Sequence, residues 1–248
     1  MATIRPVRPQ DVDAVVRIAA AGGSPDADER YVDFVAAHGR LLVAVDEHDA
    51  VVGFAGAVAV GDVTMVTDLF VDPDHRGHGV GSAVLHAVLD GSVRRMTCSS
   101  THPAAQAAYI AAGLAPRWRL LTMRGLATGG ATPLAPAPWR HDRLDLVQYC
   151  RGLGAVVAGD AVVLTDVVAG RRVHTVLRLV TDDPASALDG ILSALPADDE
   201  VVCSVPEPHP IVPVLDARGF SVEEHDVFFA TDGVHLASEL ASVHRGLL

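Results

Sequence analysis

The chain of 248 residues contains no lysine, and all 19 of its basic residues are arginines. The lysine-bearing phosphate loop Gly-x4-Gly-Lys-Ser/Thr is therefore excluded. Aromatic residues are also scarce, at 4% of the chain, whereas apolar residues make up 50%. A core of ordinary size must therefore be built mainly from Val, Leu, Ala and Ile.

Cysteine and long apolar runs are also limited. Cys98, Cys150 and Cys203 are odd in number and far apart, so they form neither a metal-binding pattern nor a disulfide framework, and we expect reduced thiols. No apolar run reaches the roughly 18 residues of a membrane span, and no basic segment followed by an apolar one opens the chain. The sequence therefore predicts a soluble, cytoplasmic protein without a membrane partner or a metal.

Negative charge predominates, because 31 acidic residues against 19 basic ones give a net charge of −12. Binding a nucleic acid backbone requires clustered basic residues, so nucleic acid is excluded as the main partner. The charge is compatible with a cationic partner such as an amine, which it would attract over a distance. The alternative is that the acidic residues serve only solubility.

The most informative stretch runs from Asp68 to Leu85. An apolar strand ends at an Asp-Pro turn, Arg76 and the alternate glycines Gly77, Gly79 and Gly81 follow, and an amphipathic helix then begins. Such a loop directs backbone N–H groups and the positive end of a helix dipole onto one point, where a phosphate or pyrophosphate can bind. The dinucleotide pattern Gly-x-Gly-x-x-Gly is excluded, because the third glycine comes one residue early. The alternative is a plain glycine-rich turn before a helix.

This pattern resembles the acetyl-CoA pyrophosphate loop of the GNAT N-acetyltransferase superfamily. The stretch from His102 to Leu114 resembles the family motif Asn-x-x-Ala-x-x-x-Tyr-x-x-x-Gly-Phe/Leu, with Tyr109 and Gly113 in place and a histidine where Asn is usual. The hydrophobic periodicity of residues 1–126 predicts the element order β-α-α-β-β-β-α-β-α-β, which is the order of the GNAT fold. We therefore expect an α/β fold with a mixed sheet.

The resemblance implies an N-acetyltransferase that passes acetyl from acetyl-CoA to a primary amine, in a small molecule or a peptide, by direct attack in a ternary complex. It implies that Tyr109 is the general acid and that a backbone N–H group near Leu69–Val71 stabilises the oxyanion. The residues expected to bind acetyl-CoA are Leu69, Phe70, Val71, Arg76, Gly77, His78, Gly79, Val80, Gly81, Ser82, His102 and Tyr109.

A base is also needed, because a primary amine is mostly protonated at neutral pH. Asp68, near the end of the motif strand, is the candidate, either directly or through a water chain. The alternatives are that Asp68 is a structural carboxylate and that Tyr109 only packs. Asp26, Asp28 and Glu29 lie where acceptor loops of the family usually lie and could attract a cation, or they could simply complement a helix dipole.

The second half resembles a degraded copy of the first. Residues 127–139 are rich in Pro and Ala and predict a linker, which leaves a GNAT-like domain over residues 140–248. Leu177–Val180 lies 109 residues after Asp68–Val71, but no glycine series follows it, and Leu215 stands at the tyrosine position. This copy should not bind CoA in the usual way. The second copy could line the acceptor site, bind a regulator or only bury an apolar face of the first copy.

The sequence thus predicts an acetyl-CoA-dependent N-acyltransferase whose partners are acetyl-CoA and an amine. The alternative is a non-catalytic acyl-CoA-binding or sensor protein, and a pure scaffold ranks last because it leaves the glycine loop unexplained. The chain could act as a monomer whose halves form a pseudo-dimer, or as a homodimer.

Overall fold

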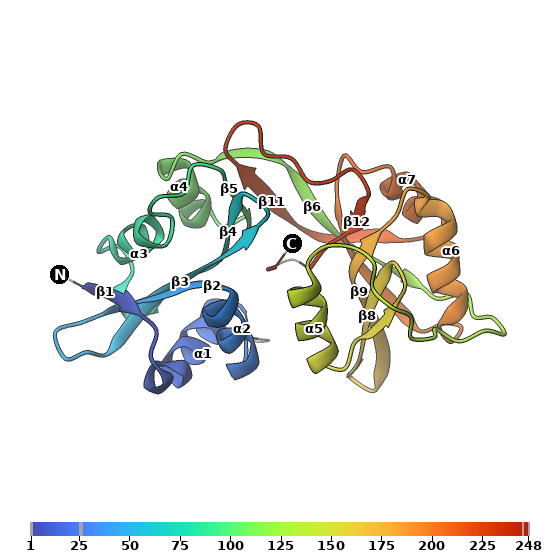
Figure 1. The fold of residues 1–248 in the computed structure, drawn as a ribbon, viewed down its shortest axis with the longest axis horizontal. Coiled ribbons are helices and arrows are strands. Elements are labelled where there is room, and N and C mark those ends of the chain that lie inside the picture. The colour runs from blue at the N-terminus through green and yellow to red at the C-terminus, as the bar shows by residue number, and fades with distance from the viewer. Residues whose placement is uncertain (1, 25–26, 245, 248) are drawn as a thin grey trace. The chain divides into compact units, whose positions relative to one another are not determined.

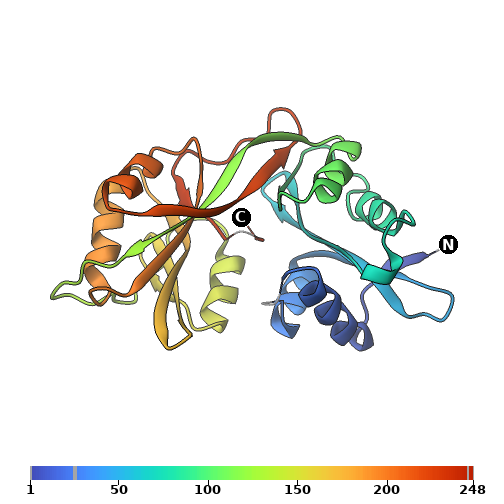
Figure 2. The same cartoon turned by 180° about the vertical axis from the view of Figure 1, so that it is seen from behind.

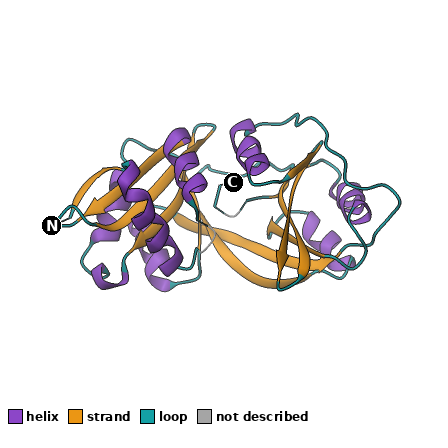
Figure 3. Ribbon diagram, turned by 90° about the horizontal axis from the view of Figure 1, so that it is seen from below, coloured by secondary structure: helices purple, strands orange, loops and turns teal. Residues whose placement is uncertain are grey.

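The computed structural model describes residues 2–24, 27–244 and 246–247, and the chain forms two compact units (Figure 1). Unit 1 comprises Met1–Arg117 and Phe228–Val234, and unit 2 comprises Trp118–Val227 and His235–Leu248. Both combine helices with strands (Figure 3). The units follow packing rather than sequence order, and the domain division at residues 127–139 stays a prediction.

Unit 1 has its elements in the predicted order. Its strands are β1 (Thr3–Pro6), β2 (Gly39–Val45), β3 (Val51–Val60), β4 (Val63–Val71), β5 (Arg95–Ser99) and the start of β6 (Ala115–Leu126). Its helices are α1 (Val12–Ala21), α2 (Glu29–His38), α3 (Val80–Val88) and α4 (Pro103–Ala111), with 3-10 turns η1 (Pro9–Asp11) and η2 (Pro73–His75). α1 and α2 cover one face of the sheet, and α3 and α4 cover the other (Figures 1 and 2).

The sheet of unit 1 has the strand order β1-β2-β3-β4-β5, and β11 (Ser221–Ala230) pairs with β5. β3 lies in the middle and reads Val-Val-Gly-Phe-Ala-Gly-Ala-Val-Ala-Val, with its first eight residues buried. A continuous apolar strand of this kind fits a position covered by helices on both faces. β4, which leads into the glycine loop, pairs with this buried strand along its length.

Unit 2 repeats the later part of this order. It contains α5 (Leu144–Gly152), β7 (Val156–Ala158), β8 (Ala161–Val168), β9 (Arg171–Val180), α6 (Pro184–Ala194), β10 (Glu200–Pro206), α7 (Ile211–Ala217) and β12 (Leu240–Ser242). Its sheet runs β11-β6-β10-β9-β8-β7, and β12 pairs with β9. In unit 2, α5 lies on one face, and α6 and α7 lie on the other (Figure 1).

Local hydrogen bonds support the repeat. His102 accepts from the N–H of Ala104 at the start of α4 (3.2 Å), and His209 accepts from the N–H of Ile211 at the start of α7 (3.0 Å). At the ends of these helices, Leu114 N–H bonds to Tyr109 O and Phe220 N–H bonds to Leu215 O, after glycines with φ of 84° and 79°. The same caps at both ends mark α4 and α7 as equivalent, and Leu215 does stand at the tyrosine position.

The strand register corrects one detail of the repeat. β4 has an extra residue at Thr67, because Gly56 opposes Asp68 and Ala57 opposes Val66. β9 has the same bulge at Leu177, because Val162 opposes Arg178 and Val163 opposes Val176. Asp68 therefore corresponds to Arg178, and the sequence alignment with Leu177 was wrong by one residue, since letters alone do not show a bulge.

Residues 127–137 are irregular, as their composition predicts, yet they are bound to unit 2. The N–H groups of Thr128 and Gly129 donate to Leu192 O, and Ala137 N–H donates to Val157 O. The three cysteines are free thiols, as expected. No helix among the described residues combines the length and the apolar character that a bilayer crossing requires.

The end of β11 completes the core of unit 1. Phe228 and Phe229 are fully buried, the ring centroid of Phe229 lies 6.0 Å from that of Tyr109, and Thr231 N–H donates to Arg95 O (3.0 Å). A segment more than a hundred residues beyond the rest of unit 1 is therefore part of its fold.

We predict that Phe229→Ala destabilises the protein by about 3–5 kcal/mol, because it leaves a cavity in the core of unit 1. Thermal and urea unfolding of the full chain measure the change. Val222→Ala, on the exposed part of the same strand, is the control and should have little effect. Equal effects of the two substitutions would contradict the role of this segment in the core.

Candidate active site

The candidate site lies where the strands β4 and β5 stop pairing. The two strands pair in parallel only from Thr64 with Arg95 to Val66 with Thr97, although β4 continues to Val71. The bulge at Thr67 follows directly, and a bulge bends its strand away from its neighbour. The β5-facing edge of Leu69–Val71 is thereby offered for hydrogen bonding to a ligand.

The glycine loop follows at the end of β4. Gly77 and Gly79 have φ of 80° and 79°, and Gly79 is the N-cap of α3. Only glycine adopts this backbone freely. Gly79 has no side chain to cap the helix, and the first turn of α3 carries no acidic residue. The N–H groups of Val80, Gly81 and Ser82 are therefore available to an anion.

Arg76 adds a positive charge at this point. Its Nε donates to Val71 O (3.0 Å), which holds the exposed guanidinium beside the loop. Within the described residues no carboxylate forms an ion pair with Arg76, so its charge is available. The loop, the start of α3 and Arg76 together fit the pyrophosphate of a CoA thioester.

Two other glycines bring α3 close to the sheet. A Cβ on Gly81 would lie 3.2 Å from a methyl of Val71, and a Cβ on Gly53 would lie 3.0 Å from Phe70 O and 3.2 Å from a methyl of Val80. Both contacts are tighter than side chains normally allow. The third glycine of the motif thus serves packing, whereas the first two serve backbone conformation.

Asp68 lies beyond the bulge and is buried, with 6% of its surface exposed. Its Oδ2 accepts hydrogen bonds from the Tyr31 hydroxyl (2.7 Å) and the Thr67 hydroxyl (2.8 Å). A Cβ on Gly56 would lie 3.1 Å from this oxygen, so the glycine makes room for the carboxylate. Burial raises the pKa of Asp68 above its ordinary value of 3.8, and the two hydroxyl donors oppose that shift.

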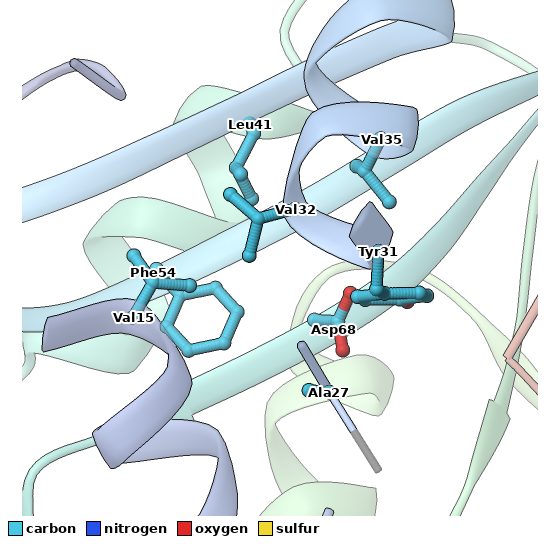
Figure 4. Close-up of a pocket in the computed structure, with 8 residues that line it drawn as sticks. All are labelled: Val15, Ala27, Tyr31, Val32, Val35, Leu41, Phe54 and Asp68. Atoms are coloured by element: carbon cyan, nitrogen blue, oxygen red, sulfur yellow. The ribbon is translucent and has the colours of Figure 1, made fainter. Parts of the chain in front are cut away.

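Asp68 closes a small cavity of about 10 Å³, which is roughly the space of one water molecule. Figure 4 shows the carboxylate beside the Tyr31 ring, with apolar side chains around it. The lining residues are Val15, Ala27, Tyr31, Val32, Val35, Leu41, Phe54 and Asp68. A carboxylate in apolar surroundings is a candidate acid or base.

Tyr109 lies on α4 and is 5% exposed. Burial raises the pKa of its phenol, the nearby charges of Asp68 and Cys98 raise it further, and the Thr97 hydroxyl opposes the shift. Thr97 itself donates to Val66 O (2.9 Å), at the point where the two strands part. The phenol therefore stays protonated over a wide pH range and can donate a hydrogen bond near this opening.

Two of the predicted residues have local partners. His102 is exposed, and its Nδ1 caps α4, so the ring does what an Asn side chain does at a helix start. Asp28 caps α2 by accepting from Tyr31 N–H (2.9 Å), which agrees with the helix-dipole alternative. Asp26 lies outside the described residues. Glu29 stands in the first turn of α2.

The structure thus brings Leu69–Val71 and Arg76–Ser82 together at the end of β4, with Asp68 on the same strand. Tyr109 is connected to this region by its hydrogen bond with Thr97, which in turn donates to Val66 O. Sequence reasoning missed Tyr31 and Thr97, because each meets its partner across a long stretch of chain. The acidic residues before Tyr31 indicated the start of a helix. They did not show which carboxylate would accept a hydrogen bond from the Tyr31 hydroxyl.

Among its described residues, unit 2 has neither the free strand edge nor the uncapped helix N-terminus of unit 1. β9 and β10 also pair only as far as Val176 with Cys203, but β12 fills the opening, with Ser242 donating to Val176 O (2.8 Å) and Val243 N–H to Ser204 O (2.9 Å). α6 carries the Asp183 carboxylate at its N-terminus, bonded to Ser186 N–H (3.1 Å). An anion site of the unit 1 kind is therefore confined to unit 1 among the described residues.

Comparisons with known proteins agree with this geometry. Residues 15–113 match the sequence profile of the acetyltransferase (GNAT) family. A mycothiol acetyltransferase of Clavibacter sepedonicus is 40% identical over 97 residues, which are 38% of this chain and 32% of the relative. This chain is thus similar to about a third of the length of that relative.

Two solved structures resemble the whole chain. A protein of Pyrococcus horikoshii assigned as an acetyltransferase has a TM-score of 0.70, with 15% identity, over 98% of this chain and 94% of that one. A GCN5-related N-acetyltransferase of Sphaerobacter thermophilus has a TM-score of 0.55, with 13% identity, over 95% and 98%. At these identities the likeness shows the fold, and the predicted GNAT fold is confirmed. Residues 15–113 are therefore similar in sequence to the acetyltransferase (GNAT) family, in a chain that has the GNAT fold.

Proposed function

We propose that unit 1 transfers the acetyl group of acetyl-CoA to a primary amine. The observation that carries the proposal is the uncapped N-terminus of α3 at the end of a strand whose free edge leads to a buried carboxylate. The N-terminus of α3 suits the pyrophosphate of CoA, and the free edge of β4 suits the pantetheine amides. The buried carboxylate of Asp68 suits the chemistry of an amine.

The amine attacks the thioester carbonyl carbon directly in a ternary complex. A new C–N bond forms, the C–S bond breaks, and CoA leaves as a thiolate. A backbone N–H group in the region Leu69–Val71 stabilises the oxyanion, since a donor fixed by the sheet needs no reorganisation. Before attack, the ammonium group must lose a proton, which costs about 4–5 kcal/mol for an ordinary amine at pH 7.

Asp68 takes this proton, directly or through one water in the adjoining cavity. Its raised pKa makes it a better base than an exposed carboxylate, and the bonds from Tyr31 and Thr67 keep the ionised form accessible. The same negative charge in apolar surroundings attracts a cationic acceptor. The net charge of −12 favours the approach of such an acceptor.

Tyr109 assists the departing thiolate. Full proton transfer from an ordinary phenol to a thiolate whose thiol has a pKa near 8.5 is uphill by roughly 2 kcal/mol, and burial of Tyr109 increases that difference. We therefore assign Tyr109 a hydrogen bond to the developing thiolate, and the thiol forms with the second proton, which the nitrogen releases when the C–S bond breaks. This role needs the hydroxyl and not only the ring.

The test is release of free CoA thiol from acetyl-CoA across a panel of amines, amino acids and peptides, with Tyr109→Phe in parallel. We expect an acceptor-dependent signal that falls by about 10²–10⁴-fold in the variant, while acetyl-CoA still binds. An unchanged rate in Tyr109→Phe would remove the acid role. Binding without any acceptor would instead favour the alternative of a non-catalytic acyl-CoA sensor.

A second prediction concerns the glycine loop. Gly79→Asp should weaken acetyl-CoA binding by at least about tenfold, because it strains a left-handed position and places a carboxylate at the start of α3. Gly91→Asp is a matched control, since Gly91 has a φ of 76° and open space around its Cα but follows the end of α3. Isothermal titration with acetyl-CoA compares them. Equal losses would mean that backbone strain, and not the anion site, explains the effect.

A third prediction concerns Asp68 and pH. The folded state binds a proton at Asp68 more tightly than the unfolded state, so this residue reduces stability as pH rises above its ordinary pKa of 3.8. Asp68→Asn should therefore raise Tm at pH 7.5, by about 2–4 °C for each kcal/mol regained, and the gain should vanish near pH 4.

Asp68→Asn should also lower turnover by at least about a hundredfold if Asp68 is the base. Asp33→Asn, at an exposed position of α2, controls for the loss of one negative charge. A fall in Tm at pH 7.5 would show that the bonds from Tyr31 and Thr67 outweigh the burial penalty. Retained turnover would exclude the base role.

A further inference from the structure

Three side chains of unit 2 form a hydrogen-bonded series across its sheet. Thr165 lies on β8, His174 lies opposite it on β9, and Asp199 directly precedes β10. The Thr165 hydroxyl lies 2.8 Å from His174 Nδ1, and His174 Nε2 lies 3.0 Å from Asp199 Oδ2. A hydroxyl, an imidazole and a carboxylate bonded in this order are the groups that activate a hydroxyl as a nucleophile.

The bond to Asp199 decides which nitrogen of the neutral imidazole carries the proton. An ionised carboxylate only accepts hydrogen bonds, so Nε2 of His174 donates to it and Nδ1 is left to accept from the Thr165 hydroxyl. The His174 side chain is 4% exposed, so its surroundings hold the ring in this orientation. Arg172 Nε also lies 3.0 Å from Asp199 Oδ2, which fixes the carboxylate beside the ring.

The hydroxyl at the other end of the series is accessible, because Thr165 is exposed. In the part of the chain that the structure describes, β7 pairs with β8 only over Ala161–Val163, so the outer edge of β8 at Thr165 has no neighbouring strand. An open edge presents the N–H group of every second residue, here that of Thr165 or of Asp166, as a donor to an oxyanion. Val167, which is 70% exposed and follows two residues later, gives the same face an apolar surface.

The sheet itself does not require this series. In unit 1, Ala59 and Thr64 form the pair that lies at the same distance from the bulge as Thr165 and His174 do in unit 2. Ala59 has no hydroxyl and Thr64 has no basic nitrogen, yet the strands pair in the same way. The hydroxyl and the imidazole are therefore particular to unit 2 and are not needed to hold the two strands together.

We propose that Thr165 is the nucleophile of a second site, which hydrolyses small activated esters. The bond from Thr165 Oγ1 to the acyl carbon forms as the hydroxyl proton passes to His174 Nδ1, the ester C–O bond breaks, and the alcohol leaves with that proton. Water then attacks the acyl group, and one of its protons returns to Thr165 through His174, which releases the carboxylic acid. A single backbone donor stabilises the oxyanion weakly, so the ester must carry a good leaving group.

Asp199 is a positioning residue in this site, because it acts through the His174 ring. The site is independent of the proposed acetyl transfer, since all three side chains belong to unit 2. Loss of one activity therefore leaves the other to be measured.

The test labels the full-length protein with p-nitrophenyl acetate, quenched by acid, and separately with a small alkyl fluorophosphonate, which forms a P–O bond to an activated hydroxyl as fluoride leaves. Peptide mass spectrometry locates the adducts. We expect labelling of Thr165, its loss in Thr165→Val and its retention in Thr165→Ser. His174→Gln should slow the labelling by about 10²–10⁴-fold. Asp199→Asn should slow it as well, and Asp199→Glu should restore part of the rate.

Thr175→Val is the matched control, because Thr175 follows His174 on β9 and so faces the other side of the sheet. This substitution should leave the labelling unchanged. If His174→Gln does not fold, comparison of the folded wild type with the urea-unfolded wild type decides, since an ordinary threonine is not labelled. The proposal is overturned if neither reagent labels Thr165, if the unfolded chain is labelled equally, or if folded His174→Gln is labelled at the wild-type rate.

Discussion

The bulge at Thr67 is the constraint on which the site of unit 1 depends. One extra residue in β4 ends the pairing with β5, frees the edge of Leu69–Val71 and turns Asp68 into apolar surroundings. The cost is local, since one residue of the ladder is left unpaired. Gly56 on the opposing strand provides the space that Thr67 and Asp68 then occupy. The edge of Leu69–Val71 and the buried position of Asp68, on which the proposed oxyanion stabilisation and the proposed base depend, both follow from this single irregularity.

The site combines two groups that burial affects in related ways. Burial raises the pKa of Asp68 and of Tyr109, so both protonated forms are favoured before any ligand binds. Under the proposed mechanism, the raised pKa makes Asp68 a better base, whereas it makes Tyr109 a weaker acid that stays protonated and still offers a hydrogen bond. The distinction matters for mechanism, because a position shared with a family does not by itself give a residue the pKa that the reaction needs.

The sequence was sufficient for features encoded locally. The glycine loop, the helix after it and the strand before it form one continuous stretch, and their limits agree closely with α3 and β4. The sequence was not sufficient for contacts made across the chain. The bond between Tyr31 and Asp68 joins two elements, and Phe229 completes the core of unit 1 from near the C-terminus. The bulges were also invisible, because an inserted residue in a strand leaves no mark on composition and shifts an alignment by one position.

Unit 2 shows which parts of this geometry recur without the features of the proposed site. It keeps the bulge, the parting of two parallel strands and the capped helix at His209, so these belong to the fold. It changes the features that we propose to bind a CoA ester and an amine: β12 occupies the opening, Asp183 takes the helix N-terminus and Leu215 replaces the tyrosine. A unit that served only as packing would be expected to place an apolar side chain at the Asp68 position as well. Arg178 instead keeps a buried charge there, paired with Asp142, so this position of the fold accommodates a charged group of either sign.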